Sequence, residues 1–170
     1  MIIIGVDPGT ATTGYGIVKI QNPKSKIQNI LTCLDYGSIK TDPKASAPER
    51  LKKLHNELSR LIDRHRPEIL AVENVYFFKN MKTAMPVSQA KGVILLTAAK
   101  KNMPVREFTP LQMKMALTGY GRAEKKQIQG MVRLILNLKE IPKPDDAADA
   151  LGVAICCERM SGPKGLDRGF

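Results

Sequence analysis

Short apolar runs separated by turn-forming residues dominate the first part of the chain, a pattern typical of strands joined by short links. Residues 2–7 predict a first strand, 15–20 a second and 30–39 a third. Because the links between these runs are short and rich in Gly, Asn and Pro, the three strands are predicted to pair as an antiparallel meander.

Helical periodicity begins at residues 46–49, Ser-Ala-Pro-Glu, which have the Ser-x-x-Glu form of a capping box. The helix that follows has leucines on one face and ends before Pro67. Its histidines, His55 and His65, are too far apart to share a ligand and are predicted to lie on the surface. A short apolar run at 69–73 follows this long crossover, so it is expected to form a strand parallel to the first.

The second half of the chain is mostly helical in pattern. The elements predicted there are an apolar helix at 84–100, a strand at 104–108, a short helix opened by Thr109-Pro110 and running to 117, a helix from 123 to 138, and a last helix from Asp145. The apolar helix has so few polar positions that we expect burial on two sides, against the sheet and against a second subunit.

The predicted fold class is therefore α/β, with a five-stranded mixed sheet of three antiparallel and two parallel strands flanked by helices. One domain is expected over residues 1–160. The Gly-rich, charged tail at 161–170 is expected to fray.

Charge narrows the class of partner. The chain has 170 residues, and 27 basic against 16 acidic side chains give a formal net charge of +11. This balance indicates a polyanionic partner, with nucleic acid the leading candidate. No apolar run approaches the roughly 18 residues of a membrane span, and no signal-cleavage pattern follows the amino terminus. We therefore expect no membrane partner and a cytoplasmic location, in which the three cysteines are reduced, buried hydrophobes.

Two carboxylates, Asp7 and Glu73, each end a predicted buried strand. If those strands are parallel neighbours, the two acids lie side by side. A second pair opens the last helix, where Asp146 and Asp149 share a face at i, i+3 and Asp145 and Asp149 do so at i, i+4. Spacing alone does not choose between Asp145 and Asp146. Taken singly, Asp7 is better explained as a turn cap, and each acid of the last helix as a helix cap.

Four clustered carboxylates in a basic protein point to metal chemistry. Carboxylates raise each other's pKa values, and hard divalent cations such as Mg²⁺ relieve the repulsion through oxygen ligands. Two such ions about 4 Å apart can clamp the attacking water and the leaving oxygen of a phosphodiester. A negative pocket on a positive surface therefore predicts a metal-dependent nuclease.

Aromatic and basic residues offer a candidate DNA surface. The run Tyr76-Phe77-Phe78, close to Lys79 and Lys82, predicts a stacking wedge between phosphate-binding lysines, although a loop tucked into the core is an equal alternative. A second basic cluster around the 118–126 link is consistent with a phosphate track or with an ordinary solvated face. The residues predicted to bind DNA are Tyr76, Lys79, Lys82, Lys91, Lys114, Arg122, Lys125 and Lys126.

A set of short motifs, in consistent order over about residues 1–160, resembles the RuvC family of Holliday-junction resolvases. These motifs are Gly-Val-Asp-Pro-Gly-Thr around Asp7, Gly14-Tyr15-Gly16, Val-Glu-Asn-Val-Tyr around Glu73, Gln89-Ala90-Lys91-Gly92, the stretch from Gly121 to Lys125, and Asp-Ala-Ala-Asp-Ala-Leu at 146–151. The resemblance implies a ribonuclease H-like fold and a homodimer that nicks two strands of a four-way junction symmetrically. It also implies Mg²⁺, two ions per subunit with Mn²⁺ as a substitute, and branch-migration motor proteins as partners.

The resemblance also assigns residues. It implies that the four acids are Asp7, Glu73, Asp146 and Asp149, as catalytic residues and metal ligands, which leaves Asp145 as a cap. It places the family's wedge aromatic on Tyr76, where phenylalanine is common in the family. Its basic catalytic and DNA-contacting lysines fall on Lys114 and Lys125, and we count Lys125 among the catalytic residues.

Three alternatives stay open at this point. The stretch Asp7-x-Gly9-Thr10 also resembles the first phosphate loop of actin-like sugar kinases, which would make the chain an ATP-binding fragment. A catalytically silent junction-binding module and a single-site RNA-processing nuclease of the same fold are the others. ATP binding, the mass in solution, and cutting of four-way against linear substrates separate these alternatives.

Overall fold

The computed structural model describes residues 1–9, 11–21, 29–74 and 81–160, except for the side chains of 81–83, so the predicted tail at 161–170 lies outside it. The strands form one sheet in the order β3-β2-β1-β4-β5. Their bounds are β1 Ile2–Asp7, β2 Thr12–Gln21, β3 Ile30–Lys40, β4 Ile69–Glu73 and β5 Val105–Phe108. β1, β2 and β3 are antiparallel neighbours, whereas β4 runs parallel to β1 and β5 parallel to β4. The predicted mixed sheet is therefore confirmed.

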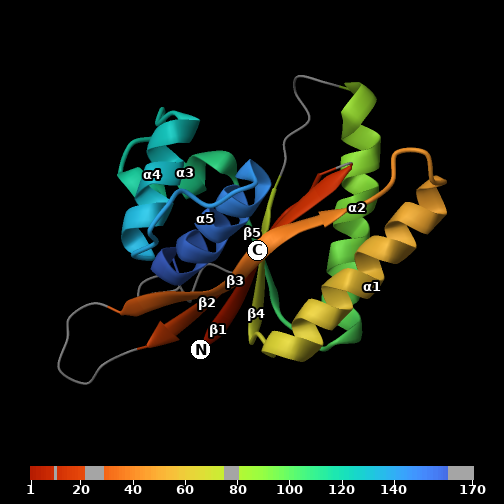
Figure 1. The fold of residues 1–170 in the computed structure, drawn as a ribbon, viewed down its shortest axis with the longest axis horizontal. Helices are drawn as coiled ribbons and strands as arrows, with labels where there is room; N and C mark the ends of the chain where they lie inside the picture. Colours follow the sequence, from red (N-terminus) through yellow and green to blue (C-terminus); the bar gives the residue numbers. More distant parts are fainter. Residues whose placement is uncertain (10, 22–28, 75–80, 161–170) are drawn as a thin grey trace.

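Helices cover both faces of this sheet (Figure 1). Their bounds are α1 Ala47–His65, α2 Met81–Lys100, α3 Pro110–Thr118, α4 Lys125–Ile135 and α5 Asp145–Met160. α1 and α2 pack on one face, against alternate apolar residues of the strands, and α3, α4 and α5 pack on the other. None of the described helices is both long and apolar enough to cross a membrane.

The helix ends agree with the capping signals, with two differences in length. The Ser46 backbone N–H donates to Glu49 Oε2 at 2.9 Å, and the Gln112 N–H donates to Thr109 Oγ1 at 3.1 Å, so both helix starts have the expected partners. α2 begins three residues earlier than predicted, at Met81, with Pro86 inside it. α4 ends at Ile135, because Asn137 adopts a left-handed backbone conformation (φ 49°) that terminates the helix.

The two histidines are half-buried, so their prediction as surface residues is wrong. The His55 ring nitrogen Nδ1 lies 2.8 Å from Thr97 Oγ1 and joins α1 to α2. His65 Nε2 lies 3.1 Å from Asp35 Oδ2 and joins the end of α1 to β3. Each ring lies at the border of the apolar face of α1, where a polar partner on the neighbouring element satisfies it.

The cysteines have the structural character that was expected. Cys156 and Cys157 are fully buried in α5, Cys33 is half-buried in β3, and none of the three forms a disulfide. Burial is the main cause that raises the pKa of the Cys156 thiol to about 12, so this side chain is a neutral, apolar part of the core.

α5 lies unusually close to the sheet because glycines line its path across β1 and β2. A Cβ atom at Gly5 would lie 2.0 Å from the Ala150 carbonyl oxygen, and one at Gly14 would lie 1.9 Å from the Asp146 carbonyl oxygen. Neither position can hold a side chain while α5 stays where it is. The amino-terminal turns of α5 are thereby fixed against the ends of β1 and β2.

We expect Gly5→Ala to destabilise the protein by about 3 kcal/mol or more, because the new methyl group would collide with the backbone of α5. Thermal or urea unfolding of the variant measures this loss. Gly130→Ala on α4 is the matched control, because nothing lies within 4 Å of its added Cβ. Helix propensity should make that control up to about 1 kcal/mol more stable. Equal stabilities of the two variants would contradict the close packing of α5.

Candidate active site

Asp7 and Glu73 lie side by side at the carboxyl ends of two parallel strands. Val6 pairs with Val72 in the β1–β4 register, so the next residue of each strand reaches the same level. A side-chain hydrogen bond joins the Asp7 and Glu73 carboxyl groups. The prediction that a parallel arrangement brings these two acids together is confirmed.

α5 brings Asp146 and Asp149 to the same end of the sheet. Asp7 pairs with Gly14 across the β1–β2 ladder, and the backbone of Asp146 rests directly on Gly14. The charges of both Asp146 and Asp149 act on Asp7. Asp145, by contrast, is exposed and turns its carboxylate toward Lys125. The tertiary structure therefore favours Asp146 over Asp145 as the member that faces Asp7.

The acids are electrostatically strained as a group. Burial, followed by the Glu73 charge and hydrogen bond and then by Asp149 and Asp146, raises the pKa of Asp7 to about 8. Burial is also the largest cause that raises the pKa values of Glu73 and Asp149. The Asp7–Glu73 pair accordingly holds one proton at neutral pH, the usual response of like charges confined at short range.

Lys125 partly neutralises this cluster from the first turn of α4. Its Nζ lies 3.2 Å from Asp145 Oδ2 and 3.2 Å from Asp149 Oδ2. Burial lowers the pKa of Lys125, but the Asp149 and Asp145 carboxylates outweigh it, so that the pKa is raised above its ordinary value. Lys125 is therefore a cation at neutral pH and cannot serve as a general base there.

The donor set suits a hard divalent cation. Among the described residues, no three His, Cys, Asp or Glu side chains already stand in the arrangement of a formed metal site. The Asp7–Glu73 hydrogen bond and the ion pair of Asp149 with Lys125 use carboxylate oxygens that a cation would take. Buried carboxylates with raised pKa values are the oxygen ligands that such a cation would stabilise, so the residues fit the metal.

Comparison with known proteins shows which family has this sequence. A family model described as crossover junction endodeoxyribonuclease RuvC matches residues 3–157. The chain belongs to the RuvC family. It is 51% identical to the RuvC of Alkaliphilus metalliredigens, over 92% of this chain and 92% of that protein. It is 53% identical to the RuvC of Pelotomaculum thermopropionicum, again over 92% of each.

Solved structures agree with this RuvC-family assignment. The Thermus thermophilus RuvC structure superposes with a TM-score of 0.86 at 35% identity, covering 94% of this chain and 95% of that one. The same organism's RuvC in complex with Holliday junction substrate gives 0.83 at 32% identity, covering 94% of each chain. The yeast mitochondrial Holliday junction resolvase Ydc2, at 16% identity and a TM-score of 0.63, shares the fold. The ribonuclease H-like fold class is confirmed, and RuvC-family membership implies use of a divalent metal.

The residues predicted to bind DNA divide into three groups. Lys114 is half-buried on α3, and the side chains of Arg122, Lys125 and Lys126 are exposed around the start of α4. Tyr76, Lys79 and the side chain of Lys82 lie outside the described residues. Lys91 is largely covered and is held against the ends of β4 and β5 by Asn74 and Glu107. Sequence reasoning missed these two partners, although strand alternation, which turns Glu107 toward α2, could have found one of them.

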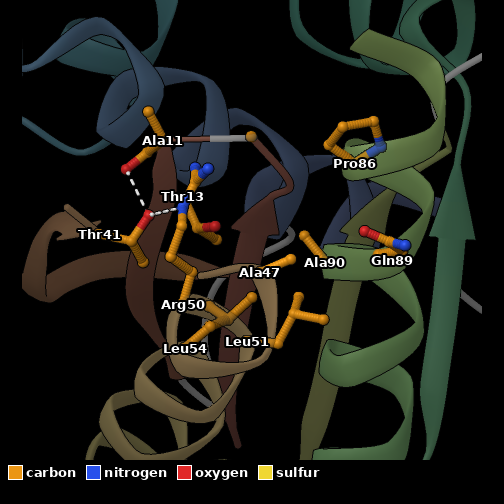
Figure 2. Close-up of a pocket in the computed structure, with 11 residues that line it drawn as sticks. Ala11, Thr13, Thr41, Ala47, Arg50, Leu51, Leu54, Pro86, Gln89 and Ala90 are labelled. Atoms are coloured by element: carbon orange, nitrogen blue, oxygen red, sulfur yellow. Dashed lines mark hydrogen bonds between the residues drawn. The ribbon is translucent and has the colours of Figure 1, made fainter. Parts of the chain in front are cut away.

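The other face of the sheet has a pocket of its own behind the end of β1. Figure 2 shows this cavity of about 110 Å³ between α1 and α2, with Gln89 and Pro86 from α2 among the residues around it. Thr41 Oγ1 accepts from Arg50 Nε at 3.0 Å and donates to the Ala11 carbonyl oxygen at 3.3 Å. These bonds fix the chain just after Asp7 from the face opposite the acids.

In metal-free protein, we expect Asp7→Asn to raise the free energy of unfolding at neutral pH by roughly 1–3 kcal/mol. Native Asp7 keeps its proton up to a pKa of about 8, whereas the ordinary value is 3.8. The native state thus binds more protons between these values, and wild-type stability falls as the pH rises through that window. The stability gained by Asp7→Asn should disappear below pH 3.8, where Asp7 is protonated in the unfolded chain as well.

Thermal unfolding in a chelator across that pH range measures the effect. Asp63→Asn is the matched control, because it removes an exposed carboxylate that forms a surface ion pair with Lys101, and we expect no gain from it. A less stable Asp7→Asn at neutral pH would contradict the charge crowding.

Proposed function

We propose that this RuvC-family nuclease resolves four-way DNA junctions as a homodimer by paired, symmetric nicks, with Mg²⁺ as its cofactor and Mn²⁺ as a substitute. One observation carries the proposal. Carboxylates from β1, β4 and α5 meet at one end of the sheet, around a buried Asp7, in a chain of net charge +11. Such an acidic site on a cationic protein suits a metal-dependent reaction on a polyanion.

Within the proposal, Asp7, Glu73, Asp146 and Asp149 hold two Mg²⁺ ions per subunit. When bound, these ions would supply an activated water and stabilise the leaving oxygen of the phosphodiester. The protein's own part is to fix the four carboxylates on rigid elements and to release the proton of Asp7. Lys125 adds positive charge beside Asp149, where a phosphate that approaches the acids would meet it.

The DNA is proposed to cross α3 and the start of α4. Lys114, Arg122, Lys125 and Lys126 lie on this side, and their charge favours the phosphate backbone of any sequence. Tyr76, with Lys79 and Lys82, stays a prediction for the wedge that enters the junction. Branch-migration motors as partners and a cytoplasmic location likewise stay predictions.

The second subunit is proposed to dock on α2. On one side of that helix, the side chains of Met85 and Leu96 are 71% and 58% exposed. Gly92 and Ala99 are exposed on the same side of the helix. An apolar stripe of this kind, with open space above Gly92, suits the close approach of an identical helix. A two-fold dimer would present two identical sites to the two-fold symmetric junction.

The alternatives receive no support. The curated relatives that match over about nine-tenths of their own length are junction endonucleases, not sugar kinases. The RuvC family likewise argues against an RNA-processing nuclease, and the three acids around Asp7, which complete the set of four, argue against a catalytically silent module.

Asp7→Asn is expected to abolish cutting of a synthetic four-way junction in Mg²⁺ while leaving the junction affinity within about twofold of wild type, because it removes a metal ligand and no DNA contact. Gel-based cleavage on mobile junctions, beside a linear duplex of the same sequence, measures both specificity and symmetry. Wild-type rates from the variant would remove Asp7 from the reaction, and equal cutting of the linear duplex would refute junction selectivity.

Leu96→Glu is expected to weaken dimerisation at least tenfold, because it would bury an unpaired charge at the proposed contact. Light scattering during size-exclusion chromatography measures the mass over a dilution series. Leu134→Glu on α4, whose leucine is 62% exposed, is the control that should keep the wild-type mass. The same mass for Leu96→Glu and wild type would move the dimer contact elsewhere.

A further inference from the structure

We infer that Lys91 is a positioning residue that holds the carboxyl end of β4 from the face of the sheet opposite the acids, and so sets where the Glu73 carboxylate stands. This inference rests on the proposed function, because it concerns the same site. It differs from the sequence-based prediction that Lys91 binds DNA.

Both contacts of Lys91 hold it against the sheet. Its Nζ donates to Asn74 Oδ1 at 2.9 Å and to Glu107 Oε2 at 2.5 Å. The Lys91 side chain is only 17% exposed, against 40% for Glu107. Charge-assisted hydrogen bonds to a carboxylate are among the strongest polar contacts in a protein, so the ammonium group has a fixed place.

Strand alternation explains why this contact reaches the active site. Glu73 turns toward Asp7 and α5, so the next residue, Asn74, turns to the other face, where α2 supplies Lys91. The Asn74 backbone N–H also donates to the Phe108 carbonyl oxygen at 2.7 Å, which continues the β4–β5 pairing past the last residue of β4. The residue after Glu73 is thus held by its backbone and by its side chain.

Glu107 completes the arrangement from the edge strand. It lies on β5, opposite Val72 in the parallel register, and so Lys91 bridges β5 to the end of β4. Without this bridge, Asn74 would keep its backbone hydrogen bond to Phe108 but lose its side-chain contact with α2. A site whose carboxylates must meet two cations depends on supporting contacts of this kind, and their loss commonly costs 10- to 100-fold in activity or metal affinity, as a rough range.

The positioning role and the DNA-contact role predict different kinetics for Lys91→Met. A positioning residue should lower kcat about tenfold at saturating junction and raise the Mg²⁺ concentration for half-maximal cutting several-fold. The junction Kd and its salt dependence should stay unchanged, and Lys91→Arg should recover most of kcat. A DNA contact would instead raise the Kd and reduce the salt slope by about one, and that result would overturn the proposal.

Glu107→Gln gives results of opposite sign for the two roles. If Lys91 positions Asn74, removing the charge of Glu107 weakens the bridge and lowers kcat. The Lys91→Met, Glu107→Gln double variant should then lose little more than either single variant. If Lys91 contacts DNA, the same substitution releases the ammonium group and tightens junction binding. Tighter junction binding by Glu107→Gln with wild-type kcat would overturn the inference. Additive losses of kcat in the double variant would overturn it as well.

Controls separate folding, charge and the proposed function. Lys101→Met removes one positive charge and the ion pair with Asp63, just after the carboxyl-terminal end of α2, and should leave kcat unchanged. Thermal unfolding checks each variant, and if Lys91→Met does not fold, Asn74→Ser tests the same contact without a change in charge. Wild-type cutting of the junction and its loss in Asp7→Asn establish the proposed function; full kcat in Lys91→Met would then refute the positioning role alone.

Discussion

Backbone contact between α5 and the β1–β2 pair is the constraint on which the site depends. Gly5 and Gly14 leave no room for a side chain beneath the helix, and Ala150 and Ala154 of α5, which face Gly5, are fully buried. Two acids on the first turns of α5 are therefore delivered to within reach of Asp7 by main-chain geometry, which does not depend on flexible side chains. If α5 were packed less closely, its acids would lie farther from Asp7, and the carboxylates could not share one ligand.

This packing concentrates negative charge where the core would otherwise be apolar. The pKa of Asp7 rises to about 8 because burial and three neighbouring carboxylates all oppose its ionisation. The protein offsets part of that cost with a shared proton and with the ammonium group of Lys125. Charge repulsion of this kind is common at functional sites, because a bound ligand relieves it.

The two faces of the sheet have separate tasks. The α5 face carries the acids and the basic residues of α3 and α4, whereas the α1–α2 face carries the supports of the chain after Asp7 and after Glu73. α2 has a further role beside support, because its inner side supplies Lys91 and its outer side leaves Met85 and Leu96 exposed for the proposed subunit contact. A subunit contact on the outer side would thus lie one helix away from the carboxyl end of β4.

The order of strands, the capping boxes and the placement of Asp7 and Glu73 at strand ends follow from the sequence alone, because they depend on local periodicity and turn chemistry. Family motifs added the choice of Asp146, which spacing left open. Only the tertiary structure decided that Asp145 turns to Lys125, that the histidines join elements, and that Lys91 faces inward. Each of these depends on a partner distant in sequence, whose position is set by how the helices pack on the sheet and not by any local pattern.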